Sequence, residues 1–147
     1  MNIIDLQNKT KAQKGKVEIY WFKNKIIGLE KTQFHRIIIP LEPFDSGLDY
    51  DEQPVLTELV LDWYELNMDN PLELDGMNLS HACYPEAECS IYIGCAHNLC
   101  DVKKLLFSKI NNNTFNLIGS VVVEFENEGV AMNEVFKFNT DMEILET

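Results

Sequence analysis

Short apolar segments separated by turn-forming residues fill the last third of the chain, and this pattern constrains the fold most strongly. The segments cover residues 90–95, 102–110, 115–126 and 134–144. In the last two of them, one set of alternate positions is largely apolar and the other is mixed or polar, which is typical of a strand with one solvated face. Turns at such short intervals are typical of antiparallel meanders. We therefore expect consecutive antiparallel strands.

The first half of the chain also favours strands. Residues 17–22 and 26–29 are β-rich and are separated by a short polar stretch, as in a hairpin. A third apolar run, residues 34–41, reaches Pro40, which cannot donate to a strand ladder. Residues 56–66 fit both a strand and a helix, but aromatic and β-branched neighbours and the lack of a good helix cap favour a strand. The remaining long stretches, residues 43–54 and 67–85, are expected to be loops.

The expected fold is mainly β with little helix, either an antiparallel β-sandwich or a curled meander of about 7–9 strands. A chain of 147 residues with 46% apolar content can bury the core of one domain. We assign residues 17–147 to this single β-rich domain. Residues 1–16, with four lysines among polar residues, are expected to be a flexible basic lead-in.

The charge distribution is strongly uneven. Between Ile37 and Val102 the chain carries fourteen carboxylates and no lysine or arginine, and the net charge of the whole chain is −12. Such a stretch is either a solvated face or a surface shaped for a cationic partner. Because phosphate backbones and anionic lipids repel it, we expect neither nucleic acid nor a membrane as partner.

Four cysteines fall within residues 83–100, with His97 among them and His81 two residues before the first. Their spacing is wider than the close pairs of a structural zinc site, although His81 and Cys83 leave that alternative open. A strand over residues 90–95 would turn Cys89 and Cys95 to one buried face as reduced thiols. A disulfide is the third alternative. The chain shows no signal segment and no long apolar run, so we expect a cytoplasmic protein with reduced thiols.

No motif indicates catalysis or a cofactor. The cluster His97, Asn98, Cys100 and Asp101 has the residue types of a Cys-His nucleophile, but turns favour the same residues, and we expect Asn98 and Asp101 to hold a turn. The acidic loop 45–52 offers oxygen ligands for calcium but lacks the pattern of an EF-hand. We therefore expect a non-catalytic protein without a metal site or cofactor.

Aromatic residues interleaved with the acids favour protein binding, because aromatics supply contact area and carboxylates steer a basic partner. The expected contact residues are Asp45, Asp49, Tyr50, Asp51, Glu52, Tyr84 and Glu86. In size and acidity, though not in any motif, the chain is similar to bacterial immunity proteins. That resemblance implies an immunity-type inhibitor that covers the cationic cleft of a cognate basic toxin, for example a nuclease. The alternatives are a β-sandwich module that binds a metal ion or small ligand and, third, a hydrolytic enzyme.

Overall fold

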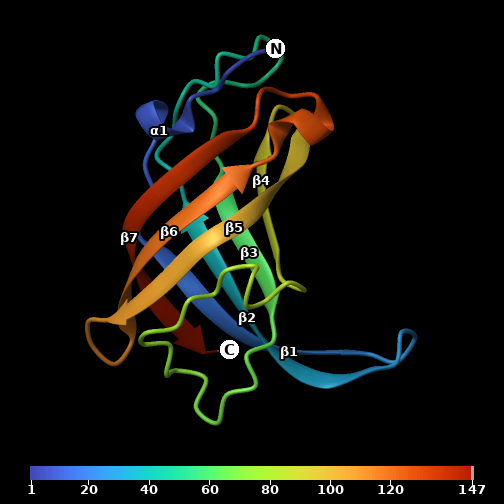
Figure 1. Ribbon diagram of the computed structural model, residues 1–147, viewed down its shortest axis with the longest axis vertical. Helices are drawn as coiled ribbons and strands as arrows, with labels where there is room; N and C mark the ends of the chain where they lie inside the picture. The colour runs from blue at the N-terminus through green and yellow to red at the C-terminus, as the bar shows by residue number, and fades with distance from the viewer. Residues whose placement is uncertain (147) are drawn as a thin grey trace.

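Residues 1–146, which the computed structural model describes, form a closed barrel of seven strands (Figure 1). A short helix precedes the barrel and a 3-10 turn lies between its last two strands. The elements are α1 (Leu6–Lys9), β1 (Gly15–Asn24), β2 (Leu29–Pro40), β3 (Glu58–Tyr64), β4 (Glu88–Ile93), β5 (Ala96–Lys109), β6 (Thr114–Val123), η1 (Phe125–Glu128) and β7 (Glu134–Glu146). The prediction of a mainly β protein with little helix is confirmed, and so is the strand within residues 56–66.

The barrel is one meander that curls until its two edges meet. Each strand pairs antiparallel with the next, and β1 then pairs with β7 in parallel, with Val17 opposite Ile144. Closure is parallel because an odd number of up-and-down strands leaves the first and the last running in the same direction. The sandwich expected as one option is not formed. Alternating apolar residues are compatible with both folds, and pairing of the two edge strands is what distinguishes them.

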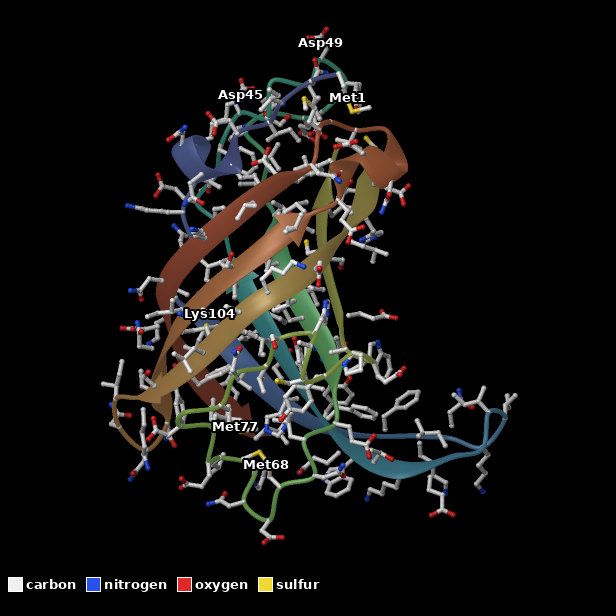
Figure 2. All side chains as sticks on the ribbon, in the orientation of Figure 1. Met1, Asp45, Asp49, Met68, Met77 and Lys104 are labelled. Atoms are coloured by element: carbon white, nitrogen blue, oxygen red, sulfur yellow. The ribbon has the colours of Figure 1, made fainter. Side chains whose placement is uncertain are left out.

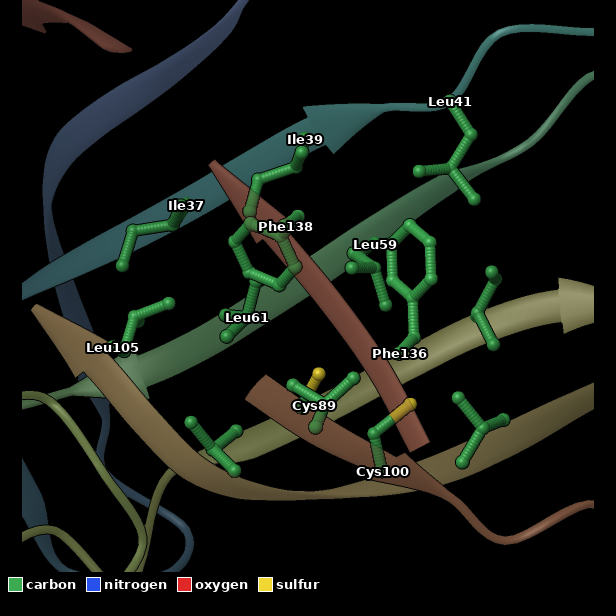
Figure 3. Close-up of a cluster of buried hydrophobic side chains, with 14 of the residues drawn as sticks. Ile37, Ile39, Leu41, Leu59, Leu61, Cys89, Cys100, Leu105, Phe136 and Phe138 are labelled. Atoms are coloured by element: carbon green, nitrogen blue, oxygen red, sulfur yellow. The ribbon is translucent and has the colours of Figure 1, made fainter. Parts of the chain in front are cut away.

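The interior of the barrel is filled by side chains. Inward-pointing residues include aliphatic and aromatic groups from strands far apart in sequence, among them Ile37, Leu59, Leu105 and Phe136 (Figure 3). Burial of each such side chain contributes about 1.5–3 kcal/mol to folding. A small barrel has an interior just wide enough for its own side chains, so the sheet can close over a packed core.

The first residues of the chain, within the segment 1–16 for which we expected a flexible lead-in, pack against this barrel. Ile4 and Leu6 are fully buried. The carboxylate of Glu134 in β7 accepts hydrogen bonds from the backbone N–H groups of Asp5 and Leu6, at 3.0 and 2.5 Å. The four lysines of this segment are exposed or half-buried. Burial of Ile4 and Leu6 holds the segment against the barrel.

Two long connections leave the barrel at opposite ends of β3. Residues 41–57 carry Asp45 and Asp49 at one end, and the connection between β3 and β4 carries Met68 and Met77 at the other (Figure 2). The β1–β2 hairpin projects beyond the barrel wall, with exposed Ile26 at its tip (Figure 1). Among the described residues, no helix is long and apolar enough to cross a membrane.

Candidate docking face

The outer surface of the β3–β4 pair carries the acids Glu58, Asp62 and Glu88. Residues at alternate positions point outward, and the register places Val60 opposite Ser90 and Asp62 opposite Glu88. Neither strand contains a lysine or arginine. We call this surface the acidic face and define it by the outward residues of both strands and by the loop residues at its two ends: Glu52, Leu56, Glu58, Val60, Asp62, Trp63, Glu65, Tyr84, Glu86, Glu88, Ser90 and Tyr92.

One end of the acidic face is a shallow groove with an apolar centre. Leu56 is 77% exposed and Tyr92 is 50% exposed. Both line the groove together with Val60 and Glu58, and both also line the adjoining depression beside Glu52. The hydroxyl of Thr57 donates to the carbonyl of Tyr92 at 2.8 Å. This bond ties the last residue of the connection 41–57 to β4. Apolar side chains surrounded by charges are the usual anatomy of a protein interface.

The other end of the acidic face is a pocket built around a β-bulge. In the β2–β3 ladder, His35 pairs with Tyr64 and Ile37 pairs with Leu61, so Asp62 and Trp63 together oppose a single residue. Trp63 adopts a left-handed backbone conformation with φ of 64°, which costs a non-glycine residue about 1–3 kcal/mol. Strain of this kind persists only where the surroundings enforce it.

The surroundings of the bulge are a polar network and an aromatic cluster on the outside of the barrel. The hydroxyl of Tyr20 donates to Asp62 at 2.6 Å, and Arg36 lies between Asp62 and Glu18 at 3.5 and 3.1 Å. Burial, with the bond to Asp62, raises the pKa of Tyr20 well above its ordinary value. The ring of Trp63 packs edge to face on its aromatic neighbours, with Phe34 at 5.3 Å between centroids. The polar contacts of Asp62 and the ring packing of Trp63 therefore hold both residues of the bulge.

The predicted contact residues fall at the two ends of β3 and not in one cluster. Five of them lie in the loop before β3. Tyr84 and Glu86 lie just before β4, whose first residue, Glu88, pairs with Asp62 near the end of β3. At about 3.3 Å per residue, the strand between the two groups is about 20 Å long. In the described part of the chain, the five acids of this set, Asp45, Asp49, Asp51, Glu52 and Glu86, make no ion pair with a lysine or arginine.

Within the acidic loop, two carboxylates serve the loop itself. Asp45 accepts a hydrogen bond from the backbone N–H of Gly47 at 2.7 Å. Asp51 accepts from the hydroxyl of Ser46 and from the backbone N–H of Gly94. Asp49, Tyr50 and Glu52 remain exposed on its surface. Among residues 1–146, no group of three or more histidine, cysteine or acidic side chains is placed to hold a metal ion.

The cysteines divide into a buried pair and an exposed pair, and no disulfide joins those described. Cys89 and Cys100 lie inside the barrel (Figure 3), and contact with Cys100, together with burial, raises the pKa of Cys89. The prediction that Cys95 is buried is wrong, because Gly94 and Cys95 both have positive φ and form the tight turn after β4. Cys95 is therefore exposed.

The residues considered for nucleophilic chemistry do not converge. His97 points outward against the ring of Tyr92, while Cys100 is buried inside the barrel. Asn98 holds the β4–β5 turn, as predicted, through hydrogen bonds from its amide to three backbone carbonyls at 3.0–3.2 Å. Asp101 does not share that role and pairs with Lys103 at 2.6 Å, which lowers the pKa of Asp101.

Sequence reasoning missed the apolar centre of the acidic face. The strand expected over residues 90–95, with Cys89 and Cys95 on its buried face, also places Tyr92 outward by alternation, so the signal for Tyr92 was present. Leu56 lies just before β3, where alternation gives no direction, and the left-handed Trp63 depends on the bulge.

No protein-family model matches the chain, and comparison with curated proteins and with solved structures finds no match.

Proposed function

We propose that this chain is a non-catalytic protein-binding domain whose acidic face docks on a basic partner. In its most concrete form, the protein is an immunity-type inhibitor that covers the cationic cleft of a cognate toxin, for example a nuclease. The observation that carries the proposal is the position of Leu56 and Tyr92, two exposed apolar side chains between Glu52 and Glu58. Neither of these acids forms an ion pair within the part of the chain that the structure describes.

The two parts of the acidic face have different physical roles in this proposal. Its carboxylates steer a basic protein towards it and raise the association rate, because opposite charges attract over the Debye length of about 8–10 Å. Leu56 and Tyr92 exclude water once contact is made and slow dissociation. A face about 20 Å long, extended by loops at both ends, suits the roughly 800 Å² that each partner contributes to an ordinary protein interface.

A location in the cytoplasm is part of the same proposal. Its reducing conditions keep cysteines as thiols, and the four cysteines of this chain are unlinked. A cytoplasmic inhibitor also meets the toxin where the toxin is made.

The test begins with the protein encoded next to this one. Co-expression should rescue bacterial growth from a toxic neighbour, and the purified chain should block its activity at about one molecule per molecule. Association should slow as salt rises from about 50 to about 500 mM. A rate that is independent of salt, or a neighbour that is neither toxic nor bound, overturns the proposal.

Paired variants locate the surface. The double variant E52K/E58K should slow association, and L56D/Y92S should speed dissociation. The matched control D69K/E128K makes the same change in net charge at two exposed acids outside the defined face. Circular dichroism of all three should match the parent. If the control slows association as much as E52K/E58K, net charge alone explains the binding and the proposed face is wrong.

A further inference from the structure

The pocket beside the bulge of β3 has the composition of a site for one cationic side chain. Its walls are Phe34, Trp63 and Tyr84, and its rim carries Glu65 and Glu86. Its volume is about 340 Å³, near the lower limit of ligand-sized pockets. It therefore suits a single long side chain better than a large ligand.

The aromatic walls come from three separate segments that the fold brings together. Phe34 belongs to β2 and Trp63 to the bulge of β3, and their ring centroids are 5.3 Å apart and almost perpendicular. Tyr84 comes from the connection before β4 and packs on the buried ring of Tyr64 at 5.8 Å. Rings held in this way present fixed π surfaces, which attract cations.

The charges at the rim favour the same class of ligand. Glu65 and Glu86 are both exposed, and within residues 1–146 neither forms an ion pair. Arg36, on the neighbouring strand β2, is already held by Glu18 and Asp62. The pocket thus combines aromatic walls, two unpaired carboxylates and no lysine or arginine in its lining.

The bulge supplies an independent reason to regard this pocket as a built feature. The left-handed conformation at Trp63 accompanies the extra residue in β3, and the ring lies in the pocket wall. Bulges recur where a strand must aim a side chain at a site, and backbone strain gathers at binding sites. Here both occur at one residue of the pocket.

We propose that this pocket binds the guanidinium group of an arginine from the partner. A guanidinium group is planar, so it stacks on aromatic rings while its N–H groups reach carboxylates. The inference rests on the proposed function for the source of the arginine, but binding of the group itself does not require the partner. This arginine would anchor the end of the acidic face at Trp63, about 20 Å from Leu56 and Tyr92.

The test uses small probes and therefore does not depend on finding the partner. The variant W21F leaves Trp63 as the only tryptophan of the chain. Titration with arginine amide or N-methylguanidinium should change its fluorescence saturably, whereas the uncharged analogue N-methylurea should not. Equal responses to N-methylurea and N-methylguanidinium would overturn the proposal.

Two exposed cysteines give a second readout with an internal control. Cys83 lines the pocket and Cys95 lies in the β4–β5 turn, outside it. Arginine amide should slow alkylation of Cys83 and leave Cys95 unchanged. The variant E65Q/E86Q should weaken the fluorescence response to arginine amide about tenfold or more and remove the protection of Cys83. Equal slowing of both cysteines, or an unchanged response in E65Q/E86Q, refutes the site. If the small probes bind saturably but the neighbouring protein is neither toxic nor bound, the pocket is supported and the proposed function fails.

Discussion

The carboxylate of Asp51 accepts a hydrogen bond from the backbone N–H of Gly94 at 3.1 Å, across 43 residues of sequence. This bond joins the acidic loop to the turn that follows β4, next to Tyr92. One acid of the predicted contact set is therefore a positioning residue, which keeps the loop beside the apolar groove. Its neighbours Asp49, Tyr50 and Glu52 remain exposed.

The first prediction compares Asp51 with Asp49. The variant D51A should lower the free energy of unfolding by about 1–3 kcal/mol, because the buried Gly94 loses the acceptor for its N–H. The variant D49A, at an exposed position, should change it by no more than about 0.5 kcal/mol. Urea unfolding of both variants measures the difference, and equal losses would show that the bond to Gly94 does not stabilise the loop.

The second prediction concerns Gly119 in β6, which lies directly opposite Phe138 in β7. A Cβ atom at residue 119 would overlap with the ring of Phe138. The variant G119A should therefore destabilise the barrel by about 1–3 kcal/mol through overpacking. In a double-mutant cycle, G119A should cost less in an F138L background, where the ring is absent. Additive losses in thermal or urea unfolding would contradict this account.

The third prediction is a pH dependence caused by His35. This side chain is buried, its Nε2 lies 2.8 Å from the carbonyl oxygen of Pro71, and burial lowers its pKa from 6.5. Below about pH 6.5 the unfolded chain binds a proton at His35 that the folded chain does not bind, so acid favours unfolding. The contribution of neutral His35 is present above that pH and is lost as the pH falls.

Urea unfolding at about pH 7.5, 6.5 and 5.5 tests this dependence. The free energy of unfolding should fall towards pH 5.5, and the fall should be smaller in H35Q, which keeps a donor but does not titrate. The other two histidines are present in both proteins, so the difference between the two slopes reports His35 alone. Identical slopes would rule out His35 as the source.

The fourth prediction concerns thiol reactivity. In the native protein, Cys83 and Cys95 should react quickly with a water-soluble alkylating reagent, whereas Cys89 and Cys100 should react only on unfolding. Burial and the raised pKa of Cys89 both reduce the thiolate that such a reagent attacks. Mass spectrometry of peptides after timed alkylation identifies each site. Rapid native labelling of Cys89 would show that the barrel opens near β4.

The strands and the charge of the protein follow from the order of its residues. Alternating apolar residues predict the strands, including β3 over Glu58–Tyr64, because burial of one face requires a period of two. The polarity of Asn98 and its place near a turn predict its bonding to backbone carbonyls. The acidity of residues 37–102 predicts a surface that repels phosphate, whatever the fold.

The way in which these elements meet depends on contacts that local patterns do not record. Closure of the barrel depends on the pairing of β1 with β7, and burial of Ile4 and Leu6 depends on Glu134, more than a hundred residues away. The exposed Cys95 follows from a two-residue turn, and the pocket beside Trp63 follows from a bulge in one ladder. Long-range pairing or strand register sets the closure, the burial of Ile4 and Leu6 and the pocket, and turn geometry sets the exposure of Cys95, whereas alternation records only which side of a strand each residue occupies.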